Sequence, residues 1–397
     1  MATPKLRFKE FNNDLDVESL NDIVVFSKGK GLSKADISSD GKNPCIRYGE
    51  LYTTYGQVID NIISKTNIKK SDCILSQAGD VIIPASGETQ IDIATAACVL
   101  HDGIILSGDL NILSHKENGA WLAYYLSSAK KLEMARFAQG NSVVHLYSRQ
   151  LKDIKINKPS LKEQTKIATF LSAIDTKIDE LTQKHELLTD YKKGMMQQIF
   201  SQKLRFKGFS ASWNDIKVGS LGTFNSGGTP SKKNSAYWKG DIPWISSSDL
   251  TEDSIFEVMT TRYITREAID NSATKIIPKN SVLIVSRVGV GKVAVNSSQL
   301  CTSQDFTSLT PFEDNPVFLA YLLKSKASRL LEFNQGTSIK GFVRDDLINL
   351  SVSIPTKEEQ TKIADFLTTI DQKIDNVAEQ IDHAKTWKKG LLQQMFV

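Results

Sequence analysis

The sequence predicts an α+β protein with two mixed α/β domains, each followed by one long helix, and with the two helices paired. Two observations predict this class. A segment of 42 residues occurs twice, at 159–200 and at 355–396, and a narrow stripe of apolar residues runs through both copies. The stretches in front of them, 1–158 and 201–354, are each as long as a domain and differ greatly from one another.

The composition is that of a globular protein. Of 397 residues, 40% are hydrophobic and 24% are charged. The net charge of +4, from 49 basic and 45 acidic residues, permits a nucleic-acid partner without arguing for one. No two of the four cysteines form a CxxC pair, which argues against a disulfide framework or a zinc site. Because the sequence has neither a signal peptide nor a run of about 18 apolar residues, we expect a cytoplasmic protein without a membrane partner.

The duplication is nearly cyclic. The two copies align without a gap at an offset of 196 residues, and 20 of the 42 positions are identical. The motif Leu-Arg-Phe-Lys at 6–9 recurs at 204–207, shortly after the first copy ends. If the two units pack about a pseudo-two-fold axis, the end and the start of the chain should therefore lie close together.

Each repeated segment is predicted to be one long helix. A proline is followed by Ser160 or Thr356 at a plausible N-cap, and Glu163 or Glu359 three residues later would complete a capping box. Apolar residues then recur at alternating spacings of four and three, which is typical of a coiled-coil seam. The predicted seam consists of Ile167, Leu171, Ile174, Ile178, Leu181 and Leu188 in the first copy and Ile363, Leu367, Ile370, Ile374, Val377 and Ile381 in the second.

Two unrelated core helices in separate domains would be the alternative explanation of these segments. The near-identity of the two seams favours mutual packing instead. A single narrow apolar stripe on a helix of about 39 residues, about 58 Å long, also needs a partner stripe.

The two variable domains are predicted to be mixed α+β with a short-stranded sheet. Short β-branched runs are separated by Gly, Asn and Ser, and longer apolar stretches carry a helical pattern. The predicted strands lie at 81–83, 104–106, 282–285 and 293–295, and the predicted helices lie near 118–138 and 315–333.

In the second domain, a polar loop with a Gly-Gly-Thr-Pro turn at 227–230 carries the candidate DNA contacts. Lysines and backbone N–H groups can bind phosphates, and Ser, Asn and Lys can read base edges. A solvated loop is the alternative interpretation. The candidates in this loop and just after it are Thr229, Ser231, Lys232, Lys233, Tyr237, Trp238, Ser246 and Ser247. Four further candidates lie later in the domain, at Arg287, Lys292, Lys340 and Arg344.

The first domain has an analogous basic, glycine-containing stretch at 28–34, followed by a Tyr-rich stretch at 47–55. It lacks the Gly-Gly-Thr-Pro turn, so its candidate contacts rest on the analogy alone. They are Lys28, Lys30, Lys34, Arg47, Tyr48 and Tyr52.

Motifs for catalysis are absent from the sequence. It contains no Asn-Pro-Pro-Tyr motif of an amino-methyltransferase, and no proline is followed by Asp. The segment 289–293 lacks the Ser/Thr and the upstream spacing of a phosphate-binding Walker loop, so a strand turn is expected there. The five histidines are scattered without metal-ligand spacing. We therefore expect no catalytic or metal centre in this chain.

Three features together resemble the specificity subunits of type I restriction-modification systems. They are the duplicated P-x-x-x-E-Q-T-K-I-A-x-F-L-x-x-I-D-x-K-I-D segment, the stretch GGTPS…YWKGDIPWISSSDL at 227–250, and the Gln-Gly-Asn/Thr-Ser elements at 139–142 and 335–338. The resemblance covers the whole sequence in the order variable, conserved, variable, conserved.

This resemblance implies that 1–158 and 201–354 are target recognition domains, each reading one half of a bipartite sequence in double-stranded DNA. The segments 159–200 and 355–397 would be helical spacers that form an antiparallel coiled coil and dock two modification (methyltransferase) subunits. Restriction subunits would join the complex. S-adenosylmethionine, ATP and Mg²⁺ are expected on the partner subunits only, and the chain itself is expected to hold no cofactor and not to be an enzyme. A coiled-coil scaffold or adaptor with two protein-binding domains is the main alternative.

Overall fold

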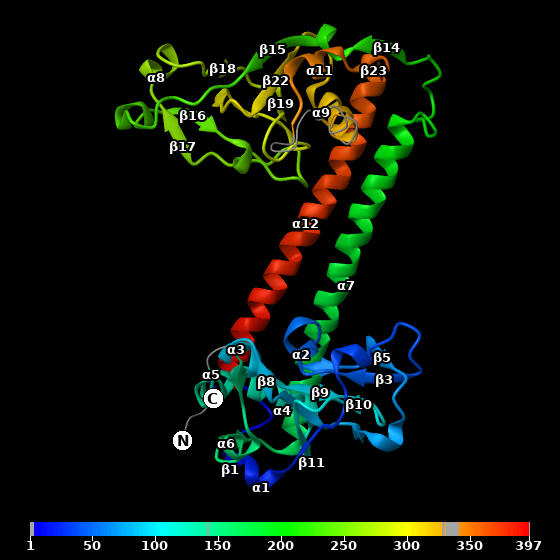
Figure 1. Ribbon diagram of the computed structural model, residues 1–397, viewed down its shortest axis with the longest axis vertical. Coiled ribbons are helices and arrows are strands. Elements are labelled where there is room, and N and C mark those ends of the chain that lie inside the picture. Colours follow the sequence, from blue (N-terminus) through cyan, green and yellow to red (C-terminus); the bar gives the residue numbers. More distant parts are fainter. Residues whose placement is uncertain (1–3, 141–142, 328–329, 331–340, 397) are drawn as a thin grey trace. The chain divides into compact units, whose positions relative to one another are not determined.

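The computed structural model describes residues 4–140, 143–327, 330 and 341–396. Two long helices, α7 (Leu161–Phe200) and α12 (Lys357–Met395), run through it (Figure 1). The candidate contact Lys340 lies outside the described residues.

The chain forms two compact units. Unit 1 consists of Met1–Thr182 and Glu379–Val397, and unit 2 consists of Gln183–Ala378. Each unit therefore contains one α/β domain, part of α7 and part of α12.

Unit 1 is built on two mixed sheets. A five-stranded sheet has the order β2-β11-β7-β9-β4, and a four-stranded sheet has the order β5-β3-β10-β6. Two-stranded pairings join β1 to β13 and β8 to β12. The strands are β1 (Asp16–Ser19), β2 (Val24–Lys28), β3 (Asn43–Ile46), β4 (Val58–Ile59), β5 (Ser64–Thr66), β6 (Ile74–Leu75), β7 (Val81–Pro84), β8 (Ser86–Gly87), β9 (Ala97–Val99), β10 (Ile105–Leu106), β11 (Leu110–His115), β12 (Val144–His145) and β13 (Lys155–Lys158), and the short helices are α1 (Leu20–Ile23), η1 (Lys34–Asp36), α2 (Glu50–Thr53), η2 (Lys70–Asp72), α3 (Gln90–Ile93), α4 (Gly119–Ser128), α5 (Lys131–Phe137) and α6 (Ser148–Leu151).

Unit 2 repeats this scaffold. Its sheets have the orders β15-β22-β19-β20 and β17-β16-β21-β18, which match β2-β11-β7-β9 and β5-β3-β10-β6 strand for strand, and β14 pairs with β23 as β1 does with β13. The strands are β14 (Asn214–Lys217), β15 (Gly222–Ser226), β16 (Ile242–Ile245), β17 (Arg262–Ile264), β18 (Ile276–Ile277), β19 (Val282–Val285), β20 (Val293–Val295), β21 (Leu300–Thr302), β22 (Phe306–Pro311) and β23 (Ser351–Ile354), and the short helices are η3 (Val218–Ser220), η4 (Ser235–Trp238), η5 (Ser247–Asp249), α8 (Arg266–Asp270), α9 (Pro316–Ser325) and α11 (Arg344–Asn349). The predicted duplication of a mixed α/β domain is thus confirmed.

The core of each domain lies between its first sheet and one apolar helix. In unit 1, α4 packs on β9 and β7 and buries Trp121, Tyr124 and Tyr125 completely. In unit 2, α9 packs on β20 and β19 and buries Phe318 and Tyr321 in the same way. Four of these aromatic side chains come from a Trp/Phe-Leu-Ala-Tyr element that occurs at 121–124 and again at 318–321, so this element has the same packing role in both halves.

The start of each long helix is held by an arginine from the repeated Leu-Arg-Phe-Lys motif. Arg7 donates from Nε and Nη2 to the two carboxylate oxygens of Glu163, at 2.7 and 2.8 Å, and Arg205 binds Glu359 in the same fork at 3.0 and 2.6 Å. The Glu163 N–H donates to Oγ of Ser160 at 3.4 Å, as the predicted capping box requires. The carboxylate half of that prediction was wrong, because the glutamate oxygens bind arginine rather than the helix N-terminus.

A buried glutamine ties each long helix to its own domain. Gln164 donates to the carbonyl of Pro159 at 2.9 Å and accepts from the Asn118 N–H at 3.0 Å. Gln360 makes the equivalent bonds at 3.2 and 3.0 Å in unit 2. The Glu-Gln pair of the repeated segment therefore anchors the helix and does not face solvent.

The two long helices are paired antiparallel. In unit 1, Asp175 of α7 forms an ion pair with Lys388 of α12, and in unit 2, Lys192 of α7 forms one with Asp371 of α12. The pair that lies further along α7 lies earlier in α12, so the two helices run in opposite directions. The two pairs are also copies of one another at the offset of 196, so the helix pairing has a pseudo-two-fold character.

The apolar stripes of these helices pack both on the partner helix and on the domain core. In unit 1, residues of α7 share one hydrophobic cluster with α4, with Leu391 and Met395 of α12, and with Phe396, which follows α12. In unit 2, residues of α12 share a cluster with Ile199 and Phe200 of α7. Buried positions of the stripes are Ile167, Leu171, Ile174, Ile178, Leu181, Ile363, Leu367, Ile370, Val377 and Ile381, and Leu188 and Ile374 are half-buried.

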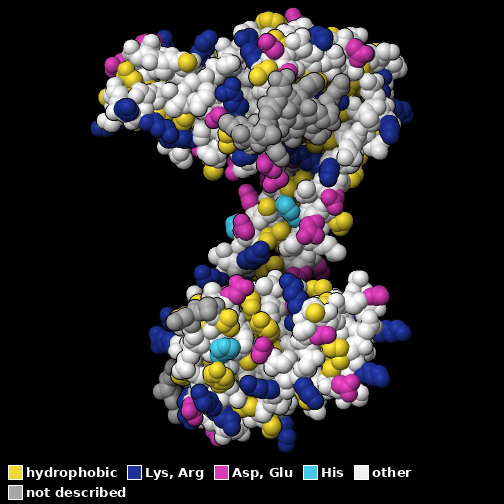
Figure 2. Space-filling view, viewed as in Figure 1, with side chains coloured by type: hydrophobic (Ala, Val, Ile, Leu, Met, Phe, Trp, Pro, Cys, Tyr) yellow, Lys and Arg dark blue, Asp and Glu magenta, His cyan; other side chains and the backbone are white. Residues whose placement is uncertain are grey.

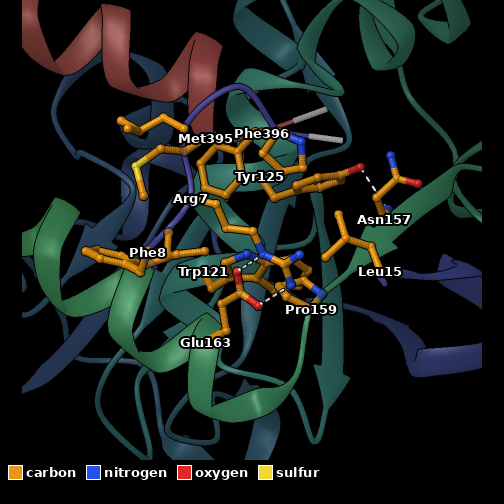
Figure 3. Close-up of a pocket in the computed structure, with 13 residues that line it drawn as sticks. Arg7, Phe8, Leu15, Trp121, Tyr125, Asn157, Pro159, Glu163, Met395 and Phe396 are labelled. Atoms are coloured by element: carbon orange, nitrogen blue, oxygen red, sulfur yellow. Dashed lines mark hydrogen bonds and ion pairs between the residues drawn. The ribbon is translucent and has the colours of Figure 1, made fainter. Parts of the chain in front are cut away.

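The start and the end of the chain meet within unit 1, as the near-cyclic repeat predicts. The Leu6 N–H donates to the carbonyl of Gln394 at 3.0 Å, and in unit 2 the Leu204 N–H donates to the carbonyl of Gln198 at 3.1 Å. Figure 3 shows the small pocket at this junction, where Met395 and Phe396 lie beside Tyr125 and the Arg7–Glu163 fork. In unit 2 the continuous chain links Gln198 to Leu204, and in unit 1 a hydrogen bond joins the equivalent residues Gln394 and Leu6.

Candidate nucleic-acid interface

The basic loop of each domain begins at a glycine that connects the two sheets. Gly29 follows β2 and Gly227 follows β15. Each donates its N–H to the carbonyl of the first residue of the neighbouring strand in the same sheet, Leu110 of β11 at 3.1 Å and Phe306 of β22 at 3.4 Å. A Cβ on Gly29 would lie 1.9 Å from the carbonyl oxygen of Ser107, and one on Gly227 would lie 2.1 Å from that of Ser303. Only glycine fits at either crossing, so the loops leave the two scaffolds at equivalent points.

In the first domain the loop after Gly29 presents its lysines to solvent. The side chains of Lys28, Lys30 and Lys34 are exposed. The backbone of the loop is fixed, since the Lys30 N–H donates to the carbonyl of Leu106 at 3.1 Å and Ser33 caps η1 through Asp36. Three ammonium groups on a fixed backbone can bind phosphates without a large cost of ordering the loop.

The other candidates of the first domain lie further inside. Arg47 binds the buried carboxylate of Glu50 at 2.9 and 3.1 Å, and Tyr48 donates its N–H to Oγ of Ser107 at 3.2 Å. Tyr52 is half-buried, and its burial raises the pKa of its hydroxyl. These side chains are half-buried and therefore less accessible than the three lysines, and Arg47 already has a counter-ion.

In the second domain the loop is held by two tryptophans. Trp244 donates from Nε1 to the carbonyl of Gly228 at 2.9 Å, and Trp238 donates to that of Ser231 at 3.2 Å. The two rings meet edge to face at 5.0 Å between centroids. Thr229 hydrogen-bonds Gln304, so its hydroxyl is also engaged. The predicted contacts Ser231, Lys232 and Lys233 are exposed, and Tyr237 is half-buried against the Trp244 cluster.

Some of the remaining candidates of the second domain form hydrogen bonds within the domain, and the others are exposed to solvent. Lys292 donates to the carbonyls of Leu250 at 2.8 Å and Ser247 at 3.2 Å, and Ser247 is buried. Ser246 caps η5 and accepts from Arg262 at 2.8 Å. Arg287 and Arg344 are exposed.

Several basic and aromatic side chains near these loops were not predicted. Arg262 lies over the Trp244 ring at 4.7 Å and forms an ion pair with Asp249. In the first domain, Tyr147 is partly exposed near Lys28 and Arg149, whose charged groups lie 5.9 and 5.1 Å from its ring centroid. Figure 2 shows Lys and Arg side chains scattered over the visible face of each unit among polar and hydrophobic ones. Only the Gln-Gly-Asn-Ser element just upstream of Tyr147 drew attention to this region in the sequence.

The described part of the chain holds no group of three or more His, Cys, Asp or Glu side chains placed to bind a metal ion. The cysteines are free, and burial raises the pKa of the Cys98 thiol to about 12 and that of Cys45 to about 11. Such thiols stay protonated at neutral pH and are poor nucleophiles. No helix within the described ranges is long and apolar enough to cross a membrane.

Comparison with protein families explains the duplicated scaffold. The profile of the type I restriction modification DNA specificity domain matches this chain twice, at 12–189 and at 211–385. The two matches cover both domains and most of both long helices. The chain therefore belongs to the family of type I restriction-modification specificity subunits.

Curated relatives carry the same description. The type I restriction enzyme MjaIX specificity subunit of Methanocaldococcus jannaschii is 34% identical over 190 residues, 47% of this chain and 44% of that protein. The EcoR124I/EcoR124II specificity subunit of Escherichia coli is 28% identical over 228 residues, 55% and 54% of the two chains. The chain thus matches about half the length of these two relatives. The MjaVIII specificity subunit of M. jannaschii is 25% identical over 426 residues and covers 97% and 94%.

Solved structures share the fold over the full length. The S subunit of a type I restriction-modification system from M. genitalium superposes with a TM-score of 0.64 at 15% identity, covering 100% of this chain and 99% of that one. A chain from a structure of type I system assembly and conformational transition gives a TM-score of 0.59 at 17% identity, covering 98% of each.

Proposed function

We propose that the chain is the non-catalytic DNA-recognition subunit of its system and that it reads a bipartite target. Residues 1–158 would read one half-site and residues 201–354 the other, while 159–200 and 355–397 serve as the helical spacers. The observation that carries this proposal is the pair of scaffolds with matching strand orders and different loop side chains. Two equivalent scaffolds with different loop side chains are suited to reading two different DNA sequences.

Affinity would come from lysines and specificity from the neighbouring polar and aromatic groups. Lys30, Lys232 and Lys233 are exposed and lie on loops with a fixed backbone, so they are the proposed phosphate contacts. Hydroxyl and aromatic groups beside them would meet base edges in a groove. Lys28, Lys34, Arg287 and Arg344 are the other exposed basic groups of this proposed surface.

The paired helices are the proposed docking site for modification subunits. Their reciprocal ion pairs repeat one pattern at the offset of 196, and this repetition supports two equivalent sites for two copies of one partner. Restriction subunits would join this complex. S-adenosylmethionine, ATP and Mg²⁺ would bind to the partners, since this chain shows no motif for any of them.

Methylation mapping tests the proposal. The chain would be expressed with the modification subunit of its own system, and the DNA of the host would be sequenced for methylated bases. We expect methylation within two short half-sites separated by an unread spacer of constant length, and none when the chain is omitted. Methyl transfer by the isolated chain, or methylation without any sequence preference, would contradict the proposal.

A further inference from the structure

Tyr147 occupies an unusual place in the first domain because its ring is exposed and flanked by two cations. The side chain is 37% exposed, and the residue is the N-cap of α6, two residues after the end of β12. The Lys28 ammonium lies 5.9 Å from the ring centroid and the Arg149 guanidinium lies 5.1 Å from it. More than a third of the side chain is open to solvent, so part of the ring can contact a ligand.

Neighbouring residues hold the Tyr147 ring in place. His145 stacks on Tyr147 with 6.0 Å between centroids and 19° between planes, and the His145 ring nitrogen Nδ1 shares a hydrogen bond with Ser86 at 3.2 Å. The Tyr147 N–H donates to Oε1 of Gln150 at 2.9 Å, which fixes the start of α6. Tyr147 is therefore presented to solvent with little freedom to lose on binding.

The charges of the two flanking cations are not neutralised by a carboxylate within the described ranges. Neither Lys28 nor Arg149 pairs with a carboxylate among the residues that the structure describes, whereas Arg47 of the same domain binds Glu50. Lys28 also immediately precedes Gly29, so the cluster is continuous with the basic loop of this domain. Two free positive charges beside an exposed ring match the alternation of phosphates and base edges in duplex DNA.

The second domain presents a different side chain at the same position of the scaffold. Val343 is 58% exposed, and its N–H donates to Oδ2 of Asp346 at 2.9 Å, just as Tyr147 donates to Gln150. The two residues are separated by the offset of 196 that relates the repeats. Arg344 lies next to Val343 and is exposed. One exposed apolar group with a basic neighbour therefore occurs at this position in both domains.

We infer that position 147 in the first domain, and its counterpart 343 in the second, contact bases and determine specificity, while Lys28 and Arg149 bind the flanking phosphates. This inference rests on the proposed function and adds the residues that discriminate within each half-site. An apolar side chain in the major groove distinguishes thymine by its methyl group, and an aromatic ring can also lie against the edges of neighbouring bases.

Binding of labelled duplexes to the complex of this chain with its modification subunits provides the test. The duplexes carry the mapped target or single-base changes within either half-site. Tyr147→Ala is expected to reduce the discrimination at one position of one half-site about tenfold, while the other half-site is read as before. Arg149→Ala and Lys28→Ala are expected to weaken binding to all duplexes and to lower the salt slope by about one unit each.

Leu132→Ala serves as the matched control, because Leu132 is 65% exposed on α5 of the same domain and lies outside this cluster. Thermal unfolding of each variant shows whether unit 1 remains folded. If Tyr147→Ala does not fold, Tyr147→Val, which carries the side chain of the equivalent position 343, takes its place with the same expected loss of discrimination. Unchanged discrimination by folded Tyr147→Ala would overturn the inference while leaving bipartite recognition intact. A wild-type complex without sequence preference would instead contradict the proposed function.

Discussion

At the scale of single residues, most of the repeated side chains have a structural role that the structure identifies. Asp371 is buried and binds both Lys192 and the hydroxyl of Tyr321. Its counterpart Asp175 binds Lys388 and accepts from Tyr124 at 2.6 Å. Burial, followed by the neighbouring carboxylate, raises the pKa of both tyrosines, so each remains a hydrogen-bond donor at any physiological pH. These contacts join the helix pair to the domain cores.

Removing one partner of the buried ion pair should be costly. Asp371→Asn leaves the Lys192 ammonium, whose side chain is 9% exposed, without its counter-ion. The expected loss is about 3–5 kcal/mol in the free energy of unfolding of unit 2, measured by urea denaturation. Glu180→Gln, which breaks the exposed Lys177–Glu180 pair, should cost about 0–1 kcal/mol. Equal effects of the two changes would show that the buried pair is not a structural anchor.

Lys324 should make the stability of unit 2 depend on pH. Burial, and then repulsion by Lys192, lowers the pKa of Lys324 from 10.5 to about 8. Between these two values the unfolded chain holds a proton on Lys324 that the folded chain has released, so stability should rise with pH across this window. The midpoint of urea unfolding should therefore increase with pH across this window in the wild type. It should increase less in Lys324→Met, which has no titratable group at this position. A parallel pH profile for the wild type and the variant would contradict the lowered pKa.

Lys232 and Lys233 provide the test of the phosphate contacts. Each change to Ala is expected to weaken binding of the complex to all DNA sequences alike and to lower the slope of log affinity against log salt by about one unit. Lys184→Ala, on the exposed face of α7, is the control. A loss confined to one base at one position would identify a base reader instead, and unchanged binding would place the lysine off the interface.

At the scale of elements, the sequence was most informative where contacts are local or repeated. The 4-3 spacing predicts both long helices because each turn of a helix repeats the same geometry. The capping-box carboxylate was misassigned because its arginine partner, Arg7, is 156 residues away from Glu163. Strand order could not be predicted, since strands of two to six residues pair over long separations. Tyr147 was missed for the same reason, because Lys28 meets it only in the folded domain.

The helix pair should act as a ruler between the half-sites. The midpoint between its two ion pairs falls between Gln183 and Lys184 in α7 and between Glu379 and Gln380 in α12. Inserting seven residues at both points keeps the phase of the seam and adds about 10 Å of helix. That length corresponds to about three base pairs of duplex. We expect methylation mapping to show the same half-sites with a longer spacer. Intact methylation with an unchanged spacer would show that the helices do not set this distance.

At the scale of the whole molecule, one scaffold is used twice within a chain whose ends meet. The Leu6–Gln394 contact closes unit 1 as the Leu204–Gln198 contact closes unit 2, so each domain has the same connections to both helices. The sequence predicted this closure because the Leu-Arg-Phe-Lys motif lies near the start of each domain. With the proposed function, this equivalence predicts that each domain reads its half-site independently of the other.

Exchange of one domain tests this independence most directly. Residues 201–354 would be replaced by the corresponding region of another specificity subunit, leaving the first domain and both long helices unchanged. The complex with the modification subunits would then be mapped for methylated sites. We predict that one half-site changes to that of the donor, while the other half-site and the spacer stay the same. A change in both half-sites, or in neither, would contradict the account.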